Sequence, residues 1–263
     1  MATYSPFFKL PFAVGGVGIG AVASGDMRPM FAPAPETDAL AHWDLGNGVT
    51  SLSDLLTGRA LVPANAAPTY DATGVLIASG GMHGLVTDIA DKANGFTIAL
   101  VLQPQQSLGV TGQSAMFQGT MTVSGGDGFG GGMYTNGSPG GTINFLANAR
   151  NAGVSQQLLR TITPLDLGNR WYFYLISVDA AGNRFAYVPG FNIVTDVTTK
   201  TPSATRKIAL GNAYYSDPPY YFGQKFSEFM VWDRGLTQAE AVAVAQRSRD
   251  RLAYKKGISL YGM

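Results

Sequence analysis

The sequence predicts an all-β sandwich that closes with a single helix. Short apolar runs recur along most of the chain, and clusters of Gly, Asn, Asp and Pro separate them, a pattern typical of short strands joined by tight turns. The aromatic-rich run 222–232 ends in a turn signal at 233–235. Directly after that turn, Thr237 and Glu240 have the spacing of a helix capping box.

The closing strand, 222–232, is apolar on both parities. Phe226 and Phe229 are three residues apart, so the alternation slips between them. Such a slip predicts either a β-bulge or a strand that is covered on both faces. The run 96–102 is also apolar on both faces, as expected of a central strand in a sandwich.

The other strands follow from the same apolar runs and turn signals. Trp43 is expected in the core, 51–58 as one helical turn or a tight loop, and 136–137 (Asn-Gly) as a hairpin turn. The glycines of 125–132 are expected to let strands approach closely, since the run lacks the Lys-Ser/Thr of a phosphate loop. The predicted strands are 39–44, 61–63, 75–78, 85–86, 114–119, 125–134, 142–147, 156–162, 171–178, 185–188 and 208–211.

The helix is predicted at 237–255. Gly257 supplies the left-handed residue that commonly follows a helix, and the apolar tail 258–263 is expected to contact another surface. The arginines at 247, 249 and 251 are expected to face water or a partner. The stripe facing the sandwich is predicted to be Ala241, Val244, Ala245, Ser248 and Leu252.

Residues 1–35 are predicted to form an extended N-terminal arm with a Pro-rich linker, and residues 36–263 the sandwich domain with its helix. The arm mimics a signal peptide, but Pro and Gly interrupt its apolar run, and the run is too short and Gly-rich for a membrane span. Phe7, Phe8 and Phe12 have no core of their own, so they are expected to make assembly contacts with another chain. The alternative is an edge strand that returns onto its own sandwich.

Composition narrows the classes of partner. The chain has 263 residues and no cysteine, which excludes a disulfide scaffold and thiolate chemistry. Its 18 Lys and Arg against 17 Asp and Glu give no basic footprint, so no nucleic-acid partner is expected. Only 13% of the residues are charged and 34 are Gly, which favours a homo-oligomer or another assembly; a tightly packed monomer is the alternative.

Five motifs follow one another along the chain: a Phe-Thr-Ile strand (96–102), a G-x-x-W strand (168–179), a Tyr-Val-Asp-Gly turn in which Pro189 replaces Asp (185–190), a Leu-x-Ile-Gly strand (208–211) and a Leu-Thr-x-x-Glu helix start (236–240). This ordered set resembles the laminin-G-like jelly rolls of the concanavalin A type, over residues 40 to 256. The resemblance implies a fold that lectins, hydrolases and structural modules share.

The residues present argue against an enzyme. Retaining glycosidases of this superfamily carry a Glu-x-Asp-x-x-Glu strand, which sets two carboxylates about 5 Å apart. This chain has no such run: Glu228 and Asp233 lie at opposite parity, and Asp233 is expected in a turn. A Ser-His-Asp triad needs a histidine, but His42 beside Trp43 is expected to be a packed core residue, and His83 lies in a loop without a Gly-x-Ser-x-Gly motif.

No metal or cofactor is predicted. Asp127 and Asp217 lie in loops, but neither has a second acid at the spacing of a calcium site, so both are expected to form turns. Relatives of the laminin-G type often bind calcium at a rim of the sandwich, which leaves a structural calcium open as an alternative.

A tyrosine segment is the predicted ligand-binding loop. Four tyrosines flank Pro218 and Pro219, which places rigid amphipathic rings at a loop tip where a sugar or a protein partner can stack. The alternative is that two of the rings cap the core. The predicted ligand-binding residues are Tyr214, Tyr215, Asp217, Tyr220 and Tyr221.

Glycine-rich, cysteine-free jelly rolls with an apolar arm resemble virion proteins of tailed bacteriophages. This resemblance implies a non-enzymatic virion protein, a tail fibre or receptor-binding appendage with lectin-like carbohydrate binding. Its partners would be other virion proteins, copies of itself and a host surface glycan, without membrane insertion. The alternatives are a capsid decoration protein, and a secreted bacterial carbohydrate-binding module or glycan hydrolase.

Overall fold

The computed structural model describes residues 36–79, 81–105, 114–122, 128–135, 143–151, 154–162, 170–191, 193–197, 200–214 and 223–263. Phe7, Phe8 and Phe12 of the predicted arm therefore lie outside the described residues, and the assignment of residues 1–35 to an arm stays a prediction.

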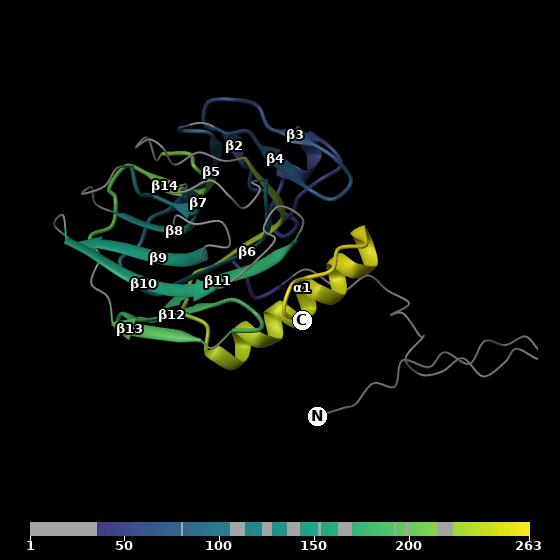
Figure 1. Ribbon diagram of the computed structural model, residues 1–263. Coiled ribbons are helices and arrows are strands. Elements are labelled where there is room, and N and C mark those ends of the chain that lie inside the picture. Colours follow the sequence, from purple (N-terminus) through teal and green to yellow (C-terminus); the bar gives the residue numbers. More distant parts are fainter. Residues whose placement is uncertain are drawn as a thin grey trace, which may run out of the picture. The chain divides into compact units, whose positions relative to one another are not determined.

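Two antiparallel sheets face each other in this part of the chain (Figure 1). The eight-stranded sheet has the order β13-β12-β11-β6-β15-β4-β3, with β1 also paired to β15, and the seven-stranded sheet has the order β10-β9-β8-β7-β14-β5-β2. In chain order, the described helices and strands are β1 Ala41–Asp44, a 3-10 turn Val49–Leu52, β2 Val62–Pro63, β3 Thr69–Tyr70, β4 Val75–Ile77, β5 Gly84–Ala90, β6 Phe96–Pro104, β7 Ser114–Gly119, β8 Gly128–Thr135, β9 Ile143–Asn151, β10 Val154–Ile162, β11 Tyr172–Val178, β12 Asn183–Tyr187, β13 Val194–Val197, β14 Lys207–Gly211, β15 Gln224–Trp232 and helix α1 Gln238–Lys256. The predicted all-β sandwich with one C-terminal helix is confirmed.

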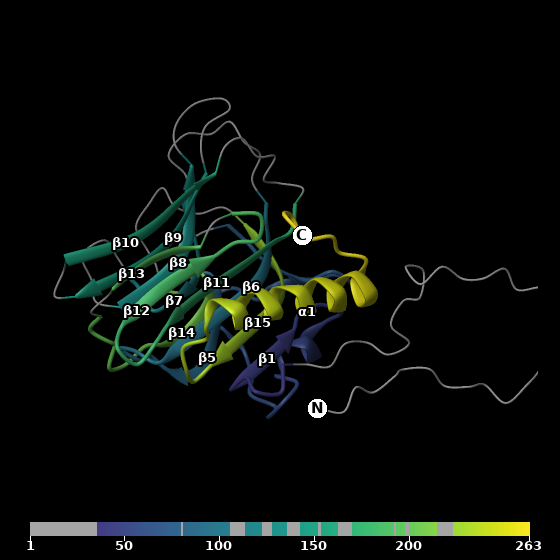
Figure 2. The ribbon, with the colours of Figure 1, turned by 90° about the horizontal axis from the view of Figure 1, so that it is seen from below.

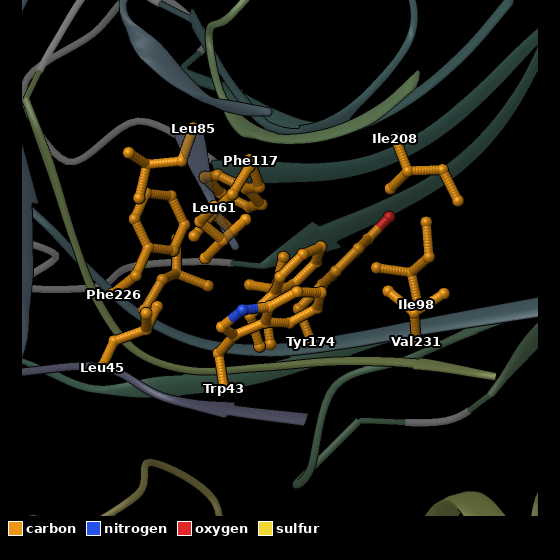
Figure 3. Close-up of a cluster of buried hydrophobic side chains, with 14 of the residues drawn as sticks. Trp43, Leu45, Leu61, Leu85, Ile98, Phe117, Tyr174, Ile208, Phe226 and Val231 are labelled. Carbon is orange, nitrogen blue, oxygen red and sulfur yellow. The ribbon is translucent and has the colours of Figure 1, made fainter. Parts of the chain in front are cut away.

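The main core lies between the two sheets, and Figure 3 shows part of it. Ile98, Leu100 and Leu102 of β6 point into it, since alternate residues of a strand face the same side. Trp43 is fully buried there and stacks on Phe229 with ring centroids 5.2 Å apart, which confirms its predicted place.

Helix α1 lies over the outer face of the eight-stranded sheet (Figure 2). A second cluster of buried apolar side chains includes residues of α1 and of this sheet. The intervening residues of β6 and β15, such as Val101 and Trp232, point into this second core. Both strands are therefore covered on both sides. The register between β15 and β6 also shifts between Phe226 and Glu228. The predicted slip therefore reflects both a break in the register and burial on two faces.

Local signals set both ends of α1. Thr237 accepts the N–H of Glu240 while the Glu240 carboxylate accepts the N–H of Thr237, as the capping box predicts. Gly257 has φ 65°, and its N–H bonds to the last turn of the helix, so the predicted C-terminal glycine is confirmed. All five residues of the predicted stripe are buried.

The prediction that Arg251 faces water or a partner was wrong. Its side chain is fully buried between α1 and β15, where it meets two carboxylates. Arg249 does face solvent, and Arg247 is half-exposed. The tail after α1 folds back onto its own sheet, where Ile258 and Leu260 are buried. Strands β3 and β13 were not predicted.

Candidate ligand-binding site

One end of the sandwich gathers the ends of many strands, and we call it the loop end. β6 ends at Pro104 opposite Gln224, where β15 begins, and β14 ends at Gly211 opposite Gly84, where β5 begins. β11 begins at Tyr172 beside the end of β6, and the antiparallel register of β7 to β10 brings their ends there too. The connections that leave and enter these strand ends are 78–83, 105–113, 136–142, 163–171 and 212–223.

The predicted tyrosine loop connects β14 to β15 at the loop end. Tyr214 is partly buried, and its hydroxyl accepts the N–H of Lys207 at 3.2 Å, so this ring is held by the sheet. Burial also raises the pKa of the Tyr214 hydroxyl above its usual value. The rest of the predicted set, Tyr215, Asp217, Tyr220 and Tyr221, lies outside the described residues.

The described residues do form a cleft at this same end, of about 400 Å³. The guanidinium carbon of Arg170 lies 5.0 Å from the centre of the Tyr261 ring. A guanidinium stacked on a ring keeps its N–H donors directed outward in its own plane, where they can meet a ligand. We call this the Arg170–Tyr261 cleft, and its lining is Arg170, Ser259, Leu260, Tyr261 and Gly262.

Tyr261 is positioned by contacts from three sides. Its backbone N–H donates to the carbonyl of Trp171 at 2.8 Å, which ties the tail to the start of β11. Its ring lies 5.4 Å from the ring of Tyr172 and stacks with that of Phe191 at 6.1 Å. The cleft is thus built on fixed groups, although the tail contributes four of its five lining residues. The residues that line it, so far as the structure describes them, include no carboxylate, so Arg170 gives it positive charge.

A larger cavity, of about 460 Å³, lies at the opposite end of the sandwich, beside the start of α1. Two of its polar side chains are already engaged: Ser177 bonds to both backbone groups of Leu236, and Asp179 accepts three bonds from Ala181 and Asn183.

The histidine and glutamate that were considered for catalysis meet in a closed cluster beneath α1. His42 Nε2 lies 2.9 Å from Glu228 Oε1, and Arg251 Nε donates to the same oxygen at 2.6 Å. Arg247 donates hydrogen bonds to both carboxylate oxygens of Glu36, and the backbone N–H of Glu36 donates to His42 Nδ1 at 2.9 Å. Since Nδ1 accepts, Nε2 carries the hydrogen that Glu228 receives.

This cluster is a structural unit. Both His42 and Glu228 are fully buried, which confirms the prediction of a packed core histidine. Burial alone would raise the pKa of Glu228, but the hydrogen bond from His42 and the charge of Arg251 hold it far below its usual value. A carboxylate held ionised and covered by a helix is unsuited to protonate a substrate.

The remaining considered residues are not brought together. Asp233 lies in the turn after β15 as predicted and pairs with Lys92. His83 lies in the connection before β5, and Asp127 and Asp217 are outside the described residues. Within the described ranges, no three metal-ligating side chains come together, and no helix is long and apolar enough to cross a membrane.

Arg170 and Tyr261 were not predicted as site residues. In the sequence, Arg170 falls within the G-x-x-W strand motif and Tyr261 within the apolar tail 258–263. The signal available in the sequence was the apolar tail that follows the helix, because apolar side chains are stabilised when they pack against another surface.

The fold is shared with known receptor-binding domains. The chain superposes on the binding domain of Botulinum Neurotoxin DC in complex with SialylT with a TM-score of 0.56 at 12% identity, covering 80% of this chain and 51% of that one. For the Botulinum Neurotoxin Type G Receptor Binding Domain the TM-score is 0.56 at 12% identity, covering 81% of this chain and 52% of that one. For a structure of botulinum neurotoxin type C the TM-score is 0.56 at 13% identity, covering 80% of this chain and 51% of that one. The chain therefore spans about half the length of these structures, and the likeness is one of fold.

A search of curated protein sequences finds no match. A family model does match, over residues 79–242, which is more than half of the chain. These residues include strands β5 to β15 and the capped start of α1. By sequence and by fold, the chain belongs to the Laminin_G_3 family of the concanavalin A-like lectin/glucanases superfamily.

Proposed function

We propose that this protein binds glycans, without cleaving them, at the loop end of its sandwich. The observation that carries the proposal is the Arg170 guanidinium, stacked over Tyr261 in an open cleft at the end where strand connections gather. Binding loops collect at the ends of such sandwiches because the strands fix their bases. The tyrosine segment 215–222 joins strands at the same end and would add stacking surface.

The chemistry of the cleft favours a sugar that carries a carboxylate. A guanidinium binds a carboxylate through two parallel N–H donors, a geometry that a neutral hydroxyl does not match. The ring of Tyr261 limits the rotamers of Arg170, which lowers the entropy lost on binding.

Relatives of the fold support this class of ligand. One is a neurotoxin binding domain in complex with SialylT, and another is a neurotoxin whose uptake into cells is dependent upon interaction with two ganglioside molecules. The absence of catalysis rests on the acid groups: Glu228 is buried under α1, and Glu240 serves as a helix cap. The third glutamate, Glu36, is buried against two arginines.

The finer proposal is a bacteriophage virion protein, a tail fibre or receptor-binding appendage. The apolar arm proposed for residues 1–35 would attach the protein to the particle, and the loop end would face the host. A labelled antibody located on intact particles by electron microscopy tests this. Label on the tail supports the proposal, and label on the capsid shell or on no particle rejects it.

The binding proposal is tested with the purified protein on an array of acidic and neutral glycans. Arg170→Gln is expected to weaken binding to carboxylate-bearing glycans at least tenfold, because it removes the charged donor. Arg59→Gln is the matched control, since this arginine pairs with Asp88 of β5 and lines no part of the Arg170–Tyr261 cleft. Equal binding by the wild type and Arg170→Gln would reject the role of the cleft.

A double variant tests the tyrosine loop separately. Tyr215→Ala with Tyr220→Ala is expected to weaken attachment to glycan-bearing cells while the fold stays intact, and Tyr254→Ala is the control because Tyr254 is exposed on α1. An unfolded double variant would instead make these tyrosines core residues.

A further inference from the structure

A lysine and an aspartate meet in a closed chamber at the end of the sandwich opposite the loop end. Lys200 precedes β14 and Asp91 follows β5, so they are distant in sequence. The Lys200 ammonium contacts Asp91 Oδ1, and the side chains are only 2% and 1% exposed. Charged side chains are seldom buried this completely, because their desolvation costs several kcal/mol per ion, on the order of the stability of a whole domain.

Aromatic rings close the chamber. Lys200 Nζ lies 4.6 Å from the ring centre of Phe96 in one sheet and 4.6 Å from that of Phe129 in the other. The two rings are themselves 4.9 Å apart, so they pack on each other and on the lysine. Water is thereby kept from the amine and from the carboxylate that it touches.

The two oxygens of Asp91 have different surroundings. Oδ1 faces Lys200, while Oδ2 accepts the hydroxyl of Thr120 at 2.9 Å and the backbone N–H of Ser203 at 2.8 Å. Two fixed donors on one oxygen are the arrangement that stabilises negative charge as it develops during attack on a carbonyl carbon. The other oxygen, beside the amine, is placed to leave.

Burial also favours the reactive form of the lysine, which is the neutral amine. In a medium of low polarity the ammonium loses the stabilisation that water gives it. Burial lowers the pKa of Lys200, an effect larger than the opposing one of Asp91. The rings of Phe96 and Phe129 hold part of the population as a cation, but a small neutral fraction is sufficient for an irreversible reaction.

We propose that Lys200 and Asp91 condense into an intramolecular amide, an isopeptide bond that joins the segment after β5 to the segment before β14. Lys200 Nζ first gives a proton to Oδ1. The nitrogen lone pair then attacks Cγ, a C–N bond forms, and the negative charge moves to Oδ2 between its two donors. Nζ gives a second proton to Oδ1, the Cγ–Oδ1 bond breaks, and one water molecule leaves. No oxidant, reductant or cofactor is consumed.

Such a bond removes the buried charges and replaces them with one amide inside the chamber. It also closes a covalent loop from residue 91 to residue 200, which restricts the unfolded chain as a disulfide does. In a chain without cysteine, this would supply the covalent cross-link that its composition otherwise lacks.

Two other Lys–Asp pairs provide internal controls. Lys92 with Asp233 and Lys225 with Asp71 make contacts of the same type, but their aspartates are 55% and 54% exposed. Water surrounds these carboxylates, so the ions stay charged and no condensation is expected.

The test is the intact mass of the full chain measured under denaturing conditions. The proposal expects a mass lower by one water molecule than the sequence gives, and a protease digest in which the peptides of Asp91 and Lys200 appear as one branched species. Lys200→Arg should restore the full mass. Asp91→Asn should lose ammonia in place of water. Wild-type protein with the full mass and separate peptides would overturn the proposal, and so would a cross-link found only at Lys92 or Lys225.

Discussion

Replacing Arg251 with Met should destabilise the protein far more than the same change at Arg249, two residues earlier on α1. Arg251 is fully buried and donates to Glu228 at 2.6 Å and to Ser248 at 3.2 Å, with Glu36 at 3.4 Å. Methionine fills much of the same volume but leaves two buried carboxylates without this cation.

The magnitude follows from the burial. Removing one partner of a buried ion pair typically costs about 3–5 kcal/mol, because the other charge is left uncompensated. Arg249 and Asp250 are both about half exposed, and a pair of this kind contributes about 0–1 kcal/mol. With an m-value of about 3 kcal/mol/M, the urea midpoint of Arg251→Met should fall by about 1 M or more.

Urea unfolding followed by tryptophan fluorescence measures the difference, since Trp43 and Trp232 are fully buried. The Arg249→Met variant controls for the loss of a positive charge and for helix propensity. If both variants unfold within a few tenths of a molar of the wild type, the cluster does not hold α1 on the sheet and the reasoning is refuted.

Three further predictions concern acid, packing and the arm. The hydrogen bond from Arg234 lowers the pKa of Glu240 to about 2, and that of Asp71 is also about 2 because Lys225 outweighs its burial. Both folded pKa values lie below the ordinary values of 4.5 for Glu and 3.8 for Asp, so the ionised carboxylates stabilise the folded protein. This contribution is complete above about pH 4.5 and is lost as the pH falls toward 2. A melting temperature that stays constant down to pH 2 would contradict the prediction. Gly119→Ala should cost about 3 kcal/mol in urea unfolding, because φ is 137° and a Cβ would lie 2.2 Å from a backbone oxygen, whereas Gly223→Ala, with no contact under 3.4 Å, should cost under about 1 kcal/mol. Deletion of residues 1–35 should leave the melting temperature within a few degrees and prevent incorporation into the particle; loss of folding would make the arm an integral strand.

The parts of the fold that local chemistry determines were predictable. The capping box of Thr237 and Glu240 and the glycine at 257 depend on neighbours within a few residues, so their pattern is visible in the sequence. The two-sided burial of β6 and β15 was visible as apolar residues on both parities. Strands β3 and β13 were missed because they are two and four residues long and partly exposed, which leaves no apolar run.

The buried polar contacts could not be predicted from the sequence, because the residues that they join are far apart along the chain. Arg251 looks like a solvent-facing helix residue until Glu36, which lies 215 positions away, is placed beside it. Asp91 and Lys200 are separated by 109 positions, and only the fold brings them together. Arg170 and Tyr261 meet for the same reason, through a tail that returns to the start of β11.

The central claim is that the loop end binds a glycan and leaves it intact. Nuclear magnetic resonance of the best-bound array glycan, recorded with the protein over many hours, tests both halves in one sample. Saturation transfer from protein to sugar protons, reduced in Arg170→Gln, with the glycan spectrum unchanged throughout, is the predicted result. New reducing-end signals at any time, or no saturation transfer to any acidic glycan, would contradict it.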